Sequence, residues 1–161
     1  MPATETRLPL RVAMEARDRH AAVAAFAEHA VLRSPFTDGL VFEGHEQLDA
    51  LLAVILDVLD DLAYTDELRV DGTAVLVGHA HVDGLKVEFT DHLKLDPDGL
   101  IEEMTVFFRP LPAATAAMRR IGQGLARRKS AFRGRVVSSM VAPLALMART
   151  GDGVGVRLVR P

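Results

Sequence analysis

Asp91 is the residue whose type and setting could most directly do chemistry. It lies in residues 85–95, where apolar and polar residues alternate, and it is the one polar residue on the apolar face. Because side chains alternate between the two faces of a strand, its same-face neighbours are all apolar: Val87, Phe89, Leu93 and Leu95. An apolar wall destabilises a charged carboxylate, so the pKa of Asp91 should rise. We expect a neutral hydrogen-bond donor or an acid; the alternative is a structural aspartate that bonds a buried backbone or tyrosine group.

A second carboxyl group, that of Asp38, lies in the turn of residues 36–39. We expect this turn near the mouth of a pocket, where Asp38, or a water held by Ser34, would be a poor base; the alternative is a plain turn aspartate. Serine itself has no basicity near neutral pH unless another base activates it. Tyr64, the only tyrosine, could reach the pocket or lie at a strand edge.

Three histidines raise the question of a metal site. His79 and His81 share one face of a strand because they alternate with Gly78 and Ala80, and His92 lies on the next strand. Imidazole is a common metal ligand, but the alternation places these rings on the outer, polar face of the sheet. We therefore expect a solvated or interface role, no metal and no cofactor. The absence of cysteine also excludes a thiolate site and disulfides.

The elements that must position these residues follow from the hydrophobic pattern. Apolar residues at the helical period predict a helix over residues 10–30, broken near Asp18, and a second helix over 45–62. A short strand is predicted between them, over 31–36. Alternation and turn residues then predict four strands, over 64–70, 74–82, 85–95 and 100–108. Two more helical segments are predicted over 113–128 and 130–148, with Pro143 as a kink, and a loose end over 150–161. This is an α+β plan, with helices on one face of a curved antiparallel sheet.

Two stretches resemble a known family. VAMEARDRHAAVAAFAEHAVLRSP looks like the opening of a ketosteroid isomerase, and TDHLKLDPDGLIEEMTVFF is similar to the paired last strands of that family. The ending VFFRPL resembles SnoaL-like proteins. The chain is therefore identified, over residues 8–110, as similar to the nuclear transport factor 2-like superfamily. The resemblance implies a cone-shaped α+β barrel in which the N-terminal helices and the sheet enclose an apolar pocket.

The resemblance also implies three catalytic positions. The general base of ketosteroid isomerases precedes the proline of the first strand, and Ser34 occupies that position. Their tyrosine on the first helix aligns with Leu10, which cannot donate a hydrogen bond. Their second aspartate is present as Asp91, in Asp91-His92. With one of three groups kept, the isomerase reaction of that family is not expected.

The expected ligand pocket combines the helices and the inner face of the sheet. Leu76, Gly78 and Ala80 share a face of the preceding strand, and this small face should leave room for a ligand. The residues predicted to line the pocket are Leu10, Met14, Phe26, Ser34, Leu51, Leu52, Val87, Phe89, Leu93, Met104, Val106 and Phe108.

Charged residues are distributed unevenly along the chain. From Leu111 onward there are ten Lys or Arg and one acid, whereas residues 1–110 carry 9 Lys or Arg against 21 acids. We expect a domain over 1–111, a basic helical extension over 112–150 and a flexible tail over 151–161. The extension should pack on the acidic body and close the pocket; an anionic membrane or nucleic acid are alternatives, and nucleic acid is not expected. The N-terminus has acids and no apolar core of a signal peptide, so a cytoplasmic location is expected.

Two functions fit this pattern. The first is binding of a small apolar molecule, such as a polyketide, steroid-like or terpenoid compound, with acid/base isomerisation, cyclisation, dehydration or hydrolysis as the reaction if there is one. The second is a non-enzymatic module that forms a homodimer through the outer sheet face and uses its basic tail for a protein or membrane partner.

Overall fold

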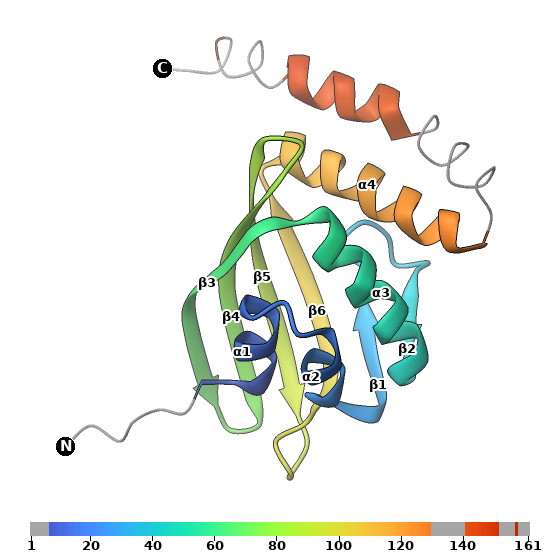
Figure 1. Cartoon of the computed structure of the whole chain (residues 1–161). Helices are drawn as coiled ribbons and strands as arrows, with labels where there is room; N and C mark the ends of the chain where they lie inside the picture. The colour runs from blue at the N-terminus through green and yellow to red at the C-terminus, as the bar shows by residue number, and fades with distance from the viewer. Residues whose placement is uncertain (1–6, 130–140, 152–156, 158–161) are drawn as a thin grey trace.

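The computed structural model describes residues 7–129, 141–151 and 157 (Figure 1). In chain order, the helices and strands labelled in Figure 1 are α1 (Pro9–Glu15), α2 (Arg19–Ala24), β1 (Phe26–Arg33), β2 (Val41–Glu43), α3 (Gly44–Val58), β3 (Asp60–Val70), β4 (Thr73–Val82), β5 (Leu85–Leu95), β6 (Ile101–Arg109) and α4 (Leu111–Lys129). Residues 141–151 form a further helix, called the C-terminal helix below. The α+β class predicted from the sequence is confirmed.

All six strands form one curved sheet, in the order β2-β1-β6-β5-β4-β3. Strands β3 to β6 form the predicted antiparallel meander. Strand β1 pairs with β6 in parallel, which the sequence pattern did not indicate. The long connection between these two strands, through α3 and the other strands, permits a parallel pair. The sheet remains open, with β2 and β3 as its edges.

The N-terminal segment divides differently from the prediction. The break at Asp18 is present, because Asp18 caps α2 by accepting a hydrogen bond from the Ala21 N–H (3.0 Å). However, α2 ends at Ala24 and β1 begins at Phe26, so the prediction of helix to residue 30 was wrong. In an alanine-rich run, the period of the apolar residues alone does not distinguish a helix from a strand. Likewise α3 ends at Val58, whereas the helix was predicted to reach residue 62. Strand β3 starts at Asp60, four residues before the predicted start at residue 64.

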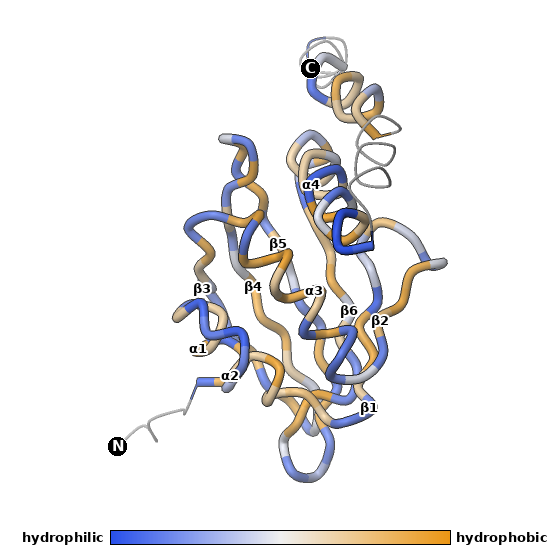
Figure 2. The backbone as a smooth tube through the Cα atoms, turned by 45° about the vertical axis from the view of Figure 1, so that its right-hand side comes forward, coloured by the Kyte–Doolittle hydropathy of each residue, from blue (hydrophilic) through white to orange (hydrophobic). Residues whose placement is uncertain are grey.

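The helices cover the concave face of the sheet. Figure 1 shows α1, α2 and α3 against this face and α4 across one end of it, and α4 contacts α3, β4, β5 and β6. Figure 2 shows apolar residues along the inner strands and α3. The buried face of α4, with Ala113, Ala117 and Ile121, belongs to the same hydrophobic core as the sheet. Among the described residues, no helix is both long enough and apolar enough to cross a bilayer.

Residues of β4 and β5 alternate between buried and partly exposed along both strands, as the sequence predicted. Direct pairing of Leu76 with Asp91 and of Gly78 with Phe89 places these four residues on the inner face. His79, His81 and His92 are half-buried on the opposite face. The His81 Nδ1 atom lies 3.6 Å from an oxygen of Asp61, an exposed carboxylate.

Candidate functional site

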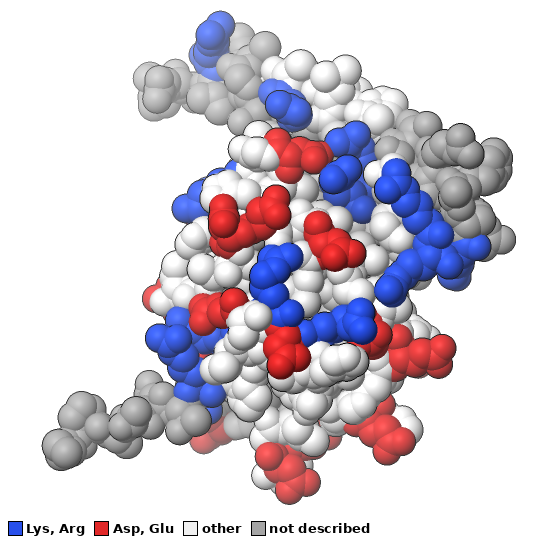
Figure 3. Space-filling model, viewed as in Figure 1, with Lys and Arg blue, Asp and Glu red and all other residues white. Residues whose placement is uncertain are grey.

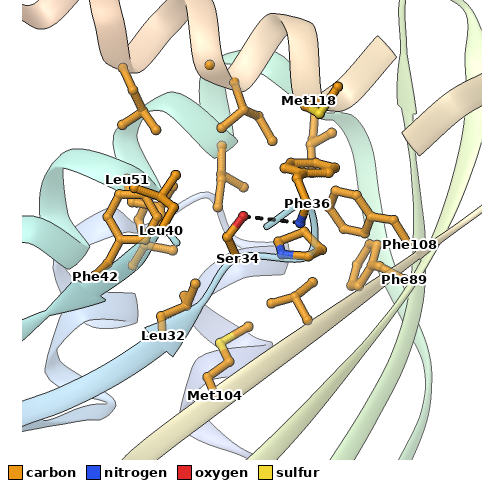
Figure 4. A pocket seen from close by; sticks show the side chains of 18 of the residues that line it. Leu32, Ser34, Phe36, Leu40, Phe42, Leu51, Phe89, Met104, Phe108 and Met118 are labelled. Carbon is orange, nitrogen blue, oxygen red and sulfur yellow. Dashed lines mark hydrogen bonds between the residues drawn. The ribbon is translucent and has the colours of Figure 1, made fainter. Parts of the chain in front are cut away.

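A cavity of about 250 Å³ lies between the inner face of the sheet, α3 and α4. Its wall is apolar except at Ser34, Thr37 and Asp91. Figure 4 shows Ser34 among its apolar neighbours. The residues that line it are Leu32, Ser34, Pro35, Phe36, Thr37, Leu40, Phe42, Leu51, Leu52, Ile55, Leu59, Leu62, Phe89, Asp91, Met104, Val106, Phe108, Met118, Ile121, Gly122, Leu125 and Val141.

Part of the predicted lining borders this cavity. The structure brings together Ser34, Leu51, Leu52, Phe89, Asp91, Met104, Val106 and Phe108 around it. It does not bring five others to the wall, which are buried in the core: Leu10, Met14, Phe26, Val87 and Leu93. The inner face of the sheet is longer than the cavity. At and under α1 and α2, these side chains belong to the hydrophobic core.

Sequence reasoning missed the walls contributed by the loop after β1, by β2 and by α4. Phe36, Leu40 and Phe42 come from the loop and β2 and point toward the cavity, as Figure 4 shows. Met118, Ile121 and Leu125 come from α4. Their spacing of three and four residues is that of one helix face, so the segment predicted to be a basic extension also carries the pattern of a cavity wall.

Asp91 is buried to 2% exposure and lies in the cavity wall. Its Oδ2 accepts a hydrogen bond from the Tyr64 hydroxyl at 3.2 Å, which is long for an O–H donor. Burial raises the pKa of Asp91 to about 7, and the Tyr64 hydrogen bond opposes this rise. The two effects leave a carboxyl group that is largely neutral below pH 7.

Tyr64 stands behind Asp91, outside the cavity lining, and is buried. Its ring meets Phe89 edge-on, with ring centroids 5.3 Å apart. Burial raises the pKa of the Tyr64 hydroxyl well above its ordinary value, and the nearby Asp91 carboxylate raises it further. Tyr64 therefore stays protonated and donates to Asp91 throughout the physiological range of pH.

Side chains of α1 hold the backbone of Tyr64 on the edge strand β3. Glu15 Oε1 accepts from the Tyr64 N–H (2.9 Å), and Arg11 Nη2 donates to the Tyr64 carbonyl (2.8 Å). Arg11 in turn lies 3.5 Å from Glu15 and 3.7 Å from Glu67. Helix α1 thereby satisfies the backbone groups that an edge strand leaves unpaired and fixes the tyrosine that faces Asp91.

Gly78 does not leave room for a ligand, contrary to the expectation from the small residues of β4. A Cβ atom at this position would lie 2.6 Å from Cζ of Phe89 and 2.7 Å from the Ala63 carbonyl oxygen. The absence of a side chain accommodates the Phe89 ring, and neither Leu76 nor Ala80 lines the cavity. The free volume lies on the other side of Phe89, toward α3 and α4.

The loop that carries Ser34 and Asp38 forms one side of the cavity. The Ser34 Oγ atom accepts from the Phe36 N–H (3.2 Å; Figure 4), and Thr37 Oγ1 accepts from the Gly39 N–H (3.1 Å). Each hydroxyl keeps its own proton for donation. Asp38 is exposed and is not among the lining residues, so the structure does not bring this carboxylate to Asp91.

Helix α4 packs on the acidic body of the protein, as expected for the first part of the extension. The carboxylate of Asp83 forms ion pairs with Arg119 (Nη2 to Oδ2, 2.8 Å) and Arg120 (Nε to Oδ1, 3.4 Å). Arg128 Nη1 donates to the Ala50 carbonyl (3.4 Å). The ion pairs anchor α4 where its apolar residues close one side of the cavity. Residues 130–140, the first part of the second predicted helical segment, lie outside the described residues.

Of the comparisons with known proteins, the one with solved structures gives matches. The sequence matches no protein-family model and no curated protein. A steroid delta-isomerase from Pseudomonas aeruginosa is similar over 75% of this chain and 86% of its own, with 26% identity and a TM-score of 0.63. A protein with a ketosteroid isomerase-like fold from Catenulispora acidiphila, solved in complex with trimethylamine, has 16% identity over 67% of this chain and 87% of its own, with a TM-score of 0.54. A protein described as a SnoaL-like polyketide cyclase from Shewanella denitrificans has 14% identity over 63% and 86%, with a TM-score of 0.53.

Proposed function

The chain has the ketosteroid isomerase-like fold of the nuclear transport factor 2-like superfamily, and on that premise we propose that its cavity binds a small apolar molecule through one hydrogen bond from Asp91. The observation that carries the proposal is a buried carboxyl group in an otherwise apolar wall. Because Oδ2 of Asp91 accepts from Tyr64, Oδ1 is the oxygen left to carry the proton toward the cavity. Pockets of this kind commonly fix an apolar ligand with few polar groups.

The cavity favours a ligand that accepts hydrogen bonds. Neutral Asp91 is a donor. The hydroxyls of Ser34 and Thr37 each accept one backbone N–H and keep a proton with which they can also donate. A volume of about 250 Å³ suits a molecule of roughly ten non-hydrogen atoms, given about 30 Å³ per water molecule in the liquid. A monoterpenoid ketone or a short polyketide fits this size better than a steroid.

The chemistry supported at this site is polarisation of a carbonyl group or protonation of a leaving group. Asp91 is the acid in either case. Among the described lining residues, no histidine, lysine or second carboxylate is placed to remove a proton. Acid-initiated cyclisation or dehydration is therefore better supported than an isomerisation that needs a base.

Binding of camphor and of its parent hydrocarbon, bornane, tests the proposal. At pH 6 we expect camphor to bind at least tenfold more tightly, because a carbonyl oxygen pairs with Asp91. Raising the pH to 8.5 ionises Asp91, whose pKa is about 7, and removes the donor, so the preference should shrink. Fluorescence of Tyr64, the only tyrosine in a chain without tryptophan, reports binding.

Three variants make this test specific. Asp91→Asn should keep the preference for camphor at both pH values, since an amide donates without titrating, whereas Asp91→Leu should lose it. Val106→Phe should fill the cavity and block both ligands. The matched control is Val77→Phe, on the outer face opposite Thr90. Equal affinity for ketone and hydrocarbon at pH 6 would refute the role of Asp91.

A homodimer through the outer sheet face is a second proposal, made for the interaction module. Support comes from the large apolar side chains exposed on or beside that face, Leu68 and Phe107. Phe107 lies opposite Thr90 and beside the half-buried outer residues of β5. We expect sedimentation equilibrium to give twice the mass of one chain, and Phe107→Asp to halve it. A wild-type mass of one chain would rule the dimer out.

A further inference from the structure

The C-terminal helix buries its small residues and exposes its large apolar ones. Ala145 and Ala148 are buried, on one face of residues 141–151, whereas Leu144, Leu146 and Met147 are exposed by 49%, 63% and 69%. A helix that simply covers the protein would place leucine and methionine inward, because burying them yields the larger free energy. Adjacent exposed apolar side chains of this size are typical of a surface that binds another protein or a membrane.

The charge around these exposed apolar residues indicates which kind of partner they bind. Residues 111–151 contain eight Lys or Arg and no acid. Asp83 pairs with two of the arginines, but Arg127, Lys129 and Arg149 are exposed and have no ion pair within the described part of the chain. Figure 3 shows Lys and Arg side chains gathered at the right of the molecule, where α4 ends. The exposed apolar residues therefore lie in a segment that carries only positive charge.

We infer that the C-terminal helix and the basic end of α4 dock on an anionic lipid bilayer. An amphipathic helix with a basic flank binds in the interface of a membrane through buried apolar side chains and attraction to anionic headgroups. A second copy of the chain fits less well, because a two-fold interface would place this patch against itself and bring basic residues together. Leu144, Leu146 and Met147 are the inserting residues, and Arg127, Lys129 and Arg149 contact the headgroups.

The docking surface adjoins the cavity. Val141, in the same helix, lines the cavity together with Ile121 and Leu125 of α4. Figures 1 and 2 both show the C-terminal helix beyond α4, on the side away from the sheet. On the proposed function, an apolar ligand dissolved in the bilayer would thus enter the cavity past α4 without crossing bulk water. The docking itself does not depend on any ligand.

Sedimentation of the full chain with vesicles tests this inference. We expect binding to vesicles of phosphatidylcholine with phosphatidylserine, little binding to phosphatidylcholine alone, and loss of binding at 0.5 M salt, since surface charges are then screened. Leu146→Ser with Met147→Ser should weaken binding at least tenfold, and so should Arg127→Gln with Lys129→Gln. All four positions are exposed, so folding should not suffer. Val12→Ser, at an exposed apolar residue of α1, is the matched control and should bind like the wild type.

Several results would overturn the docking. They are absence of binding to anionic vesicles, equal binding to neutral ones, and full binding by the helix variants. If Leu146→Ser with Met147→Ser converted a dimer to a monomer in the absence of vesicles, the apolar patch would bind a second copy of the chain instead. Camphor binding is measured without vesicles, so a failure of the proposed function and a failure of the docking are told apart.

Discussion

Replacing Asp91 by asparagine should stabilise the protein increasingly as pH rises. Burial raises the pKa of Asp91 to about 7 from 3.8 for an exposed aspartate. Between these values the unfolded chain releases the proton while the folded protein retains it, so the free energy of unfolding of the wild type falls as pH rises. The fall is absent below about pH 4 and complete above about pH 7. A difference of about three pH units, at about 1.4 kcal/mol each, amounts to about 4 kcal/mol.

Urea unfolding at pH 4, 5.5 and 8 measures this effect. The difference in unfolding free energy between Asp91→Asn and the wild type should grow by a few kcal/mol from the lowest to the highest pH, because all other titrating groups cancel. The asparagine oxygen can still accept from Tyr64, so little change is expected at pH 4. Asp38→Asn, which removes an exposed carboxyl group, is the matched control and should show no comparable growth. A pH-independent difference for Asp91→Asn would mean that its carboxyl group is not desolvated.

Truncation of Phe89 to alanine should have the other large effect. Its ring contacts Tyr64 and Phe108 edge-on, at 5.3 and 6.4 Å between centroids, and occupies the space left by Gly78. Removing a buried aromatic ring costs about 3–5 kcal/mol, because hydrophobic contact is lost and a void remains. The same change also opens the cavity toward Tyr64, so it should admit larger ligands. Thermal and urea unfolding measure the cost.

Leu111→Ala serves as the comparison for Phe89→Ala. Leu111 is 65% exposed at the start of α4, and its truncation should change stability by less than about 0.5 kcal/mol. If Phe89→Ala cost no more than this, the ring would not be part of the packed wall between cavity and tyrosine.

The fold could be predicted from the sequence largely because β4, β5 and β6 are regular. A period of two along residues 85–95 was enough to place Asp91 on the inner face, where the structure has it. The turn at Asp83-Gly84 fixed the register of β4 against β5. The start of β1 could not be predicted in this way, because Phe26 to His29 fits a helix as well as a strand.

The candidate site could be predicted only in part, because it is assembled from contacts between distant segments. Glu15 accepts from the Tyr64 N–H and Arg11 donates to the Tyr64 carbonyl only because α1 packs beside β3, and no local sequence pattern predicts that contact. Similarly, Met118 and Leu125 line the cavity because α4 folds back over α3. The pattern of α4 predicts an apolar face but not the surface on which it packs.

A carbon-13 NMR titration of the aspartate carboxyl groups tests the central claim most directly, namely that Asp91 is a neutral acid in an apolar cavity wall. The Asp91 resonance is the one missing from the spectrum of Asp91→Asn. We predict that it titrates with a midpoint near pH 7, as burial requires, and that camphor moves this midpoint upward because the ketone pairs with the protonated form. A midpoint near pH 4, unchanged by camphor, would show a solvated carboxylate and contradict the account.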